Sequence, residues 1–167
     1  MRRRCRSLIA CAIVGLAAAP ATARDTIGIF GSWGAFRDYR PRHCFAIAEP
    51  AREMKGNAHR HPFAAIATWP AASVRDQLHV QLRSRKLLGA PVILTIGEAR
   101  FRLVAGGADA WARDAREDAA IVAAMRSGSS MSIETRSTDG RAFADVYALR
   151  GAATAIDAAA LACVRGR

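Results

Sequence analysis

The histidines are the residues of this sequence whose spacing comes nearest to that of a metal site. His59 and His61 are separated by one residue, so an extended segment would direct both imidazoles to one side, and His43 is a conceivable third ligand. No carboxylate or thiol completes the set, and residues 55–62 are polar and contain a Gly-Asn pair, which is typical of a solvated loop. We therefore expect no bound metal and no cofactor.

Asp145 is the acid whose position is most informative. It alternates with Phe143 and Tyr147, which places it on the covered face of a strand, where an ionised carboxylate needs a partner. This predicts a structural buried acid that accepts hydrogen bonds from backbone or arginine. The sequence contains no Gly-x-Ser-x-Gly elbow, no His-Glu-x-x-His motif and no phosphate-binding glycine loop. We expect no catalytic residues, and the alternative is a small hydrolase that uses Asp145 or a histidine.

The first 23 residues have the three parts of an export signal. Residues 1–6 are rich in arginine, residues 8–19 are apolar, and Ala21-Thr22-Ala23 has the small residues of a cleavage site. The rival interpretation is a lipoprotein signal that ends at Cys11, but only three apolar residues precede that cysteine. We expect residues 1–23 to be a cleavable signal peptide and residues 24–167 to be one exported domain, periplasmic or associated with the outer membrane.

Removal of this signal would change the cysteine count and the charge. The mature chain would have 144 residues, its net charge would fall from +11 to +7 because four arginines are lost, and its cysteines would be Cys44 and Cys163. In an oxidising compartment we expect a structural disulfide between them, which would close a loop of 120 residues. A free catalytic thiol and an intermolecular bond are the alternatives. Two cysteines cannot form an all-cysteine zinc site.

Positive charge is concentrated in the first half of the mature chain. Residues 24–90 contain 11 basic and 5 acidic residues, whereas residues 91–167 contain 10 and 9. Arginine binds phosphate and carboxylate groups, so this asymmetry predicts contact with an anionic lipid or glycan surface; a merely solvated surface is the alternative. Nucleic acid is not an expected partner, because the sequence lacks the aromatic and basic pattern of RNA recognition. The candidate anion-binding residues are Arg37, Arg40, Arg42, Arg83, Arg85 and Lys86.

Short apolar runs with a two-residue period predict a protein built mainly from β-strands. Leu78, Val80 and Leu82 alternate with polar residues, which is typical of a strand with one buried face. Gly97-Glu98 and Asp139-Gly140 have the composition of tight hairpin turns. The expected strands are residues 27–36, 43–48, 63–69, 78–85, 92–96, 101–104, 131–135 and 143–149. This pattern is typical of a β-sandwich.

Two segments depart from this period and predict short helices. In residues 114–126, an aspartate is followed three residues later by Glu117, which resembles a helix-capping pair. Residues 152–164 are rich in alanine and place Cys163 and Val164 on one apolar face. An isolated helix of this length is marginal in water, so we expect packing or the disulfide to hold it.

Large apolar side chains are expected in the core of this domain. No run after the first 23 residues approaches the roughly 18 to 20 uninterrupted apolar residues of a membrane-spanning helix, which excludes a membrane-integral enzyme or transporter. The aromatic residues expected in the core are Trp33, Phe45, Trp69, Phe101, Trp111 and Tyr147.

Several short motifs resemble the invasion-associated locus B family of exported bacterial proteins. They are Phe30-Gly-Ser-Trp-Gly-Ala-Phe36 and residues 42–50, 101–103, 110–112, 123–128 and 145–151, with Cys163 at the end. Many members of that family carry another cysteine a few residues after the N-terminal tryptophan, whereas Trp33 is followed here by Gly34, Ala35, Phe36 and Arg37. With that thiol absent, Cys44 and Cys163 are left to pair with each other.

The resemblance implies an immunoglobulin-like β-sandwich, in agreement with the strand pattern. It implies an exported envelope protein that acts as a binding or interaction module on an envelope protein or an anionic envelope or host component. A role in host-cell invasion does not follow from a shared fold. A structural or chaperone-like subunit that offers a sheet edge to another envelope protein is a further alternative, alongside the hydrolase.

Overall fold

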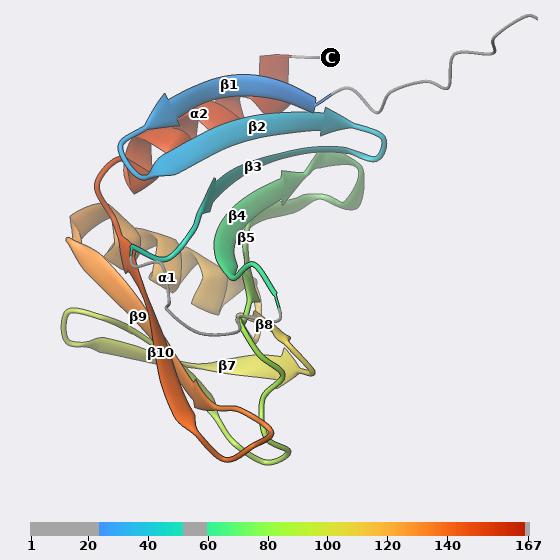
Figure 1. Ribbon diagram of the computed structural model, residues 1–167. Helices are drawn as coiled ribbons and strands as arrows, with labels where there is room; N and C mark the ends of the chain where they lie inside the picture. The colour runs from blue at the N-terminus through green and yellow to red at the C-terminus, as the bar shows by residue number, and fades with distance from the viewer. Residues whose placement is uncertain (1–23, 52–59, 166–167) are drawn as a thin grey trace, which may run out of the picture.

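Antiparallel strands and two helices make up the structure, a computed structural model that describes residues 24–51 and 60–165 (Figure 1). The strands are β1 (Arg24–Phe30), β2 (Trp33–Tyr39), β3 (Arg42–Ala48), β4 (Phe63–Trp69), β5 (Val74–Gln81), β6 (Val92–Ile96), β7 (Ala99–Gly106), β8 (Asp109–Trp111), β9 (Ser130–Arg136) and β10 (Ala142–Ala148). The helices are α1 (Ala115–Ser127) and α2 (Ala152–Arg165), and a 3-10 turn spans Pro70–Ala72. The expected all-β fold with two accessory helices is confirmed. No helix within these ranges has the length and hydrophobicity needed to cross a membrane.

The strands follow one another in a simple order. Hydrogen bonds link them as β1-β2-β3-β4-β5-β8-β7-β6-β9-β10, and every neighbouring pair is antiparallel. β7 pairs with β6 along its first half and with β8 along its second half. The sheet therefore continues through β7 into the layer that contains β6, β9 and β10, which gives a sandwich-like arrangement.

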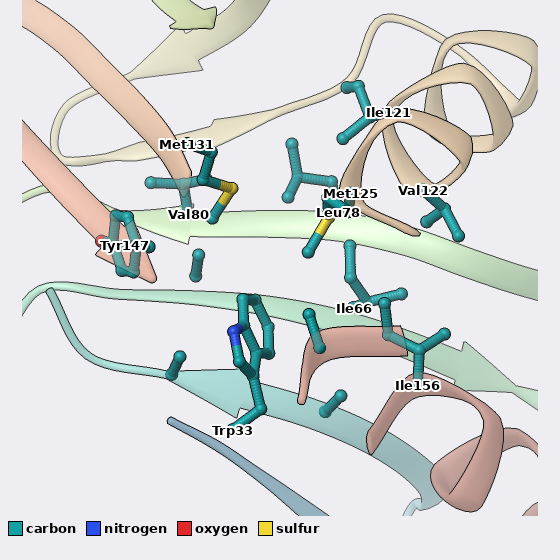
Figure 2. Close-up of a cluster of buried hydrophobic side chains, with 14 of the residues drawn as sticks. Trp33, Ile66, Leu78, Val80, Ile121, Val122, Met125, Met131, Tyr147 and Ile156 are labelled. Carbon is teal, nitrogen blue, oxygen red and sulfur yellow. The ribbon is translucent and has the colours of Figure 1, made fainter. Parts of the chain in front are cut away.

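The core lies between the inner face of β2–β5 and the elements that cover it. α2 lies against β1–β4, and α1 lies against β5. Figure 2 shows Ile121 and Met125 of α1 above Leu78, with Ile156 of α2 below Ile66. These side chains are almost completely buried. Burial of apolar surface on this scale is the main force that holds both helices on the sheet.

Two strand predictions were incomplete. The expected strand at residues 27–36 is a hairpin of two strands, because Gly31 adopts a φ of +58° and allows a tight turn. The expected strand at residues 78–85 begins at Val74 and ends at Gln81. β8 was not predicted, because three residues are too few to establish a two-residue period. The predicted turns at Gly97-Glu98 and Asp139-Gly140 are confirmed.

Two glycines allow the first hairpin to touch the connection between β10 and α2. The N–H of Ser32 donates a hydrogen bond to the carbonyl of Arg150, at 3.2 Å. A Cβ atom on Gly31 would collide with that same carbonyl, and one on Gly151 would collide with the backbone at the end of β1. We call this contact the glycine joint; it joins segments about 120 residues apart in the chain.

Both predicted helices are present, with one difference in the face that α2 buries. Asp114 precedes α1, and its carboxylate accepts the N–H of Glu117 at 2.8 Å, as the capping pair predicts. On α2, Cys163 is buried, but Val164 is 59% exposed. The buried stripe of α2 consists of Ala152, Ala155, Ile156, Ala159 and Cys163. Small side chains on this stripe let the helix approach the sheet closely.

Replacement of Asp114 by alanine should lower the free energy of unfolding by about 1 kcal/mol, because it removes the acceptor for an otherwise unpaired N–H at the start of α1. Denaturant unfolding followed by circular dichroism measures this loss. Arg116→Ala, on the exposed side of the same helix, is the control and should have a smaller effect. Equal effects of the two substitutions would contradict the capping role.

Candidate functional site

The two cysteines of the domain lie at disulfide-bonding distance. The sulfur atoms of Cys44, on β3, and Cys163, near the end of α2, are 2.07 Å apart, and their Cα atoms are 5.7 Å apart. Both residues are buried. The bond fixes the end of α2 against the inner face of the sheet, next to the candidate site described below.

Asp145 lies on the inner face of β10 and is paired with Arg83. The carboxylate is 1% exposed, and its Oδ1 accepts hydrogen bonds from Nε of Arg83, at 2.8 Å, and from Nη2. Nη2 also donates to the carbonyl of Ala144 at 2.8 Å, and the guanidinium lies over the ring of Phe143. Burial raises the pKa of the neighbouring Tyr147 hydroxyl. Arg83 is therefore bound to Asp145 and is unavailable to an external anion. The prediction that Arg83 binds an anion was wrong.

The candidate residues Arg37, Arg40 and Arg42 lie on the β2–β3 hairpin. Arg37 donates a hydrogen bond to Asp25 at 2.8 Å, and this bond raises the pKa of the Arg37 guanidinium. Nη2 of Arg42 donates to the carbonyl of Cys163 at 2.6 Å, at the C-terminal end of α2, where a cation is favourable to the helix dipole. Arg40 is exposed in the turn.

Arg85 and Lys86 lie in a different part of the molecule. The N–H of Lys86 donates to the carbonyl of Gly107, and the carbonyl of Arg85 accepts the N–H of Thr138. These bonds place the segment after β5 beside the β7–β8 and β9–β10 turns, far from the β2–β3 hairpin (Figure 1). The six candidate residues therefore do not form one patch.

A cavity of about 300 Å³ lies beside the disulfide and brings Arg42 together with Arg75. It is formed by the start of β3, the end of β4, the turn into β5 and the end of α2. Its lining includes Arg42, Thr68, Ser73, Arg75, Asp76 and Cys163. We call it the arginine cavity. Ser73 and Asp76 each have a φ of 54°, and Ser73 ends the 3-10 turn in this left-handed conformation.

Arg75 was not among the residues selected from the sequence. It is exposed, and it has no hydrogen bond or ion pair within residues 24–51 and 60–165. Pro70 is the sequence signal that could have predicted the position of Arg75, because a proline ends a strand. The chain turns back after Pro70, so the start of β5 pairs with the end of β4 and lies near Arg42.

The histidines do not form a metal centre in the described part of the chain. No group of three or more His, Cys, Asp or Glu side chains there could hold a metal ion, and His59 lies outside the described residues. The ring of His43 is stacked on that of Trp69, with centroids 4.0 Å apart. His61 is exposed.

Three of the six aromatic residues expected in the core are not fully buried. Trp33, Phe45 and Tyr147 are buried, as predicted. Trp69 and Phe101 are half-buried, whereas Trp111 is 37% exposed. The prediction was wrong for Trp111 because β8 directs this side chain to the outer face of the sheet, next to His79 of β5.

Comparison with solved structures identifies a similar fold. The crystal structure of invasion associated protein B from Bartonella henselae superposes with a TM-score of 0.56 and 19% sequence identity, over 81% of this chain and 96% of that chain. No family model matches the sequence, and a search of curated proteins gives no significant match. At 19% identity the likeness is one of fold. The chain therefore shares the fold of invasion associated protein B.

Proposed function

We propose that this chain is an exported binding module of the bacterial envelope, related to the invasion-associated locus B proteins, and that it acts without catalysis. The shared fold and the buried cysteine pair support export, because disulfides persist in oxidising compartments. The enclosure of Asp145 by Arg83 supports a non-catalytic role, since a carboxylate that is 1% exposed cannot touch a substrate.

The observation that carries the binding function is the convergence of Arg42 and Arg75 on one cavity. Guanidinium groups favour phosphate and carboxylate ligands. Asp76 also lines this cavity, so a bare anion would meet one carboxylate as well as two cations. A ligand that combines a phosphate with hydroxyl groups satisfies all three side chains, because the hydroxyls can donate to Asp76. The glycerol phosphate headgroup of an anionic phospholipid has this chemistry.

Substitution of Arg75 by glutamine should weaken binding to phosphatidylglycerol vesicles about fivefold at low salt. An arginine near an anionic membrane contributes about 1 kcal/mol to binding, and Arg75 has no partner in the described structure whose loss would disturb the fold. Vesicle sedimentation measures the affinity, with phosphatidylcholine vesicles for comparison. High salt should reduce the difference between the two lipids.

Arg100→Gln is the matched control, because it removes the same charge from an exposed position on β7. We expect this variant to bind phosphatidylglycerol nearly as well as the unmodified protein. Equal weakening by the two substitutions would mean that net charge, not the arginine cavity, attracts the lipid. Equal binding to phosphatidylcholine would contradict the anionic partner.

Export is tested separately from lipid binding. N-terminal sequencing of protein from the periplasmic and outer-membrane fractions should give Arg24 as the first residue. An N-terminus at Cys11 would show a lipoprotein signal instead. Crosslinking in intact cells followed by mass spectrometry would then distinguish a lipid partner from an envelope protein.

A further inference from the structure

The outer face of β4, β5, β8 and β7 carries an unusual set of side chains. Outer-facing positions of an antiparallel sheet are ordinarily polar, whereas here two rows of side chains are mainly aromatic or apolar. The cross-strand register gives the rows as Phe63-Gln81-Asp109-Gly106 and Ala65-His79-Trp111-Val104. We call Phe63, His79, Gln81, Asp109 and Trp111 the aromatic strip. It faces away from the core, because the alternate residues Leu78, Val80 and Ala110 are fully buried.

The rings of the aromatic strip are held in fixed positions. The imidazole of His79 lies parallel to the indole of Trp111, at an angle of 7° and a centroid distance of 5.3 Å, and Phe63 meets His79 edge-on. Nε2 of His79 is 3.0 Å from Oδ1 of Asp109. Gln81 donates a hydrogen bond to the carbonyl of His61 at 2.8 Å. Because these side chains are already ordered, little side-chain entropy of the protein is lost when a ligand binds to them.

The charges on this face indicate the class of ligand. The eight positions of the two rows contain no lysine or arginine, although the chain as a whole has a net charge of +11. Asp109 is 37% exposed and would repel an anion. The two rows themselves do not suit a polyanion, although Arg102, two residues before Val104, lies beside them on the same exposed face of β7.

The side chains of the aromatic strip match the apolar C–H face and the hydroxyl groups of a sugar ring. An exposed indole such as that of Trp111 offers an apolar surface to the C–H face of a pyranose. The carboxylate of Asp109 and the amide of Gln81 can accept and donate hydrogen bonds to its hydroxyl groups. Four adjacent strands span about 14 Å, which is long enough for a chain of sugars. We propose that the aromatic strip binds an uncharged oligosaccharide.

Titration of the purified protein with neutral tetrasaccharides tests this proposal. The panel contains the tetramers of N-acetylglucosamine, glucose, mannose and galactose, and binding is followed by calorimetry and by tryptophan emission. We expect at least one member to bind and to shift the emission. Trp111→Ala should lower that affinity at least about tenfold, by analogy with other stacking platforms. Asp109→Asn should lower it several-fold and provides a second variant that keeps the indole.

Two controls separate this site from other surfaces. Tyr39→Ala removes an exposed aromatic residue from β2, a strand that carries no residue of the aromatic strip, and should leave the affinity unchanged. The nearby cations to remove are Arg102, on the same exposed face of β7 as Val104, and Arg85, whose guanidinium lies beside Gly107. Neither Arg102→Gln nor Arg85→Gln should weaken binding if the ligand is uncharged. Thermal melting of each variant confirms that it is folded.

Several results would overturn the proposal. These are absence of binding to all four tetrasaccharides, an affinity that Trp111→Ala and Asp109→Asn leave unchanged, or a preference for oligothymidylate over the sugars. A dimer seen by sedimentation that becomes a monomer in Trp111→Ala would assign the strip to self-association instead. None of these outcomes affects the proposal for the arginine cavity, which is tested by Arg75→Gln on vesicles.

Discussion

A variant in which alanine replaces both Cys44 and Cys163 should lose about 4 to 5 kcal/mol of its free energy of unfolding. The bond joins residues 119 positions apart, so it removes a large part of the conformational entropy of the unfolded chain. It also holds the end of α2, a helix whose length is marginal for stability in isolation. Typical domain stabilities are about 5 to 15 kcal/mol, so this loss would bring the protein close to unfolding.

Urea unfolding of the oxidised, reduced and doubly substituted proteins measures the loss. The reduced protein and the Cys44→Ala/Cys163→Ala variant should unfold at similar, lower urea concentrations. Dithiothreitol should not alter the unfolding of the doubly substituted variant, because it has no disulfide to reduce. This comparison is the control for other effects of the reductant. A difference of less than 1 kcal/mol between the oxidised and substituted proteins would contradict the importance of the bond.

Replacement of Arg83 by methionine should cost about 3 to 5 kcal/mol of folding free energy. The substitution keeps an unbranched apolar side chain but leaves the carboxylate of Asp145 buried without its counter-charge. The penalty comes from this isolated charge more than from the loss of the pair's own attraction. Denaturant unfolding at neutral pH measures it.

A double-mutant cycle separates these contributions. The Arg83→Met/Asp145→Leu variant, which has neither charge, should recover most of the stability that Arg83→Met loses. Arg85→Met, two residues along the chain and exposed, is the matched control and should change the stability by less than about 0.5 kcal/mol. If Arg83→Met lowers the free energy of unfolding no more than Arg85→Met does, the Arg83–Asp145 pair does not stabilise the fold. If Asp145→Asn reduces binding to the vesicles while the melting temperature is unchanged, Asp145 has a functional role instead.

Local patterns were sufficient to predict most of the secondary structure. The alternation of Leu78 and Val80 with polar residues gave the correct buried face of β5, and the capping pair before α1 gave the start of that helix within one residue. The turn at Gly31 was missed because apolar residues continue on both sides of it. Its recognition depends on the close contact with Gly151, which is distant in the sequence.

Side-chain roles that depend on distant partners were harder to predict. Arg83 was assigned to the surface because arginine is usually exposed, but its burial depends on Asp145, 62 residues away. Trp111 was assigned to the core by residue type, whereas the register of β5 and β8 decides which face it occupies. The disulfide was predicted from the cysteine count together with the expected export to an oxidising compartment. The arginine cavity was not predictable, because four separate elements form it.

The glycine joint has a consequence for the order in which the protein can fold. The ribosome makes β1 and β2 more than 100 residues before the segment that they contact. Until then, the indole N–H of Trp33 lacks the carbonyl of Ala148, to which it donates in the finished fold at 2.9 Å. A chain interrupted before residue 148 would therefore expose apolar surface of its first hairpin, which favours aggregation or proteolysis of incomplete products. Synthesis of the chain through residues 148–151 is thus a condition for burial of the first hairpin.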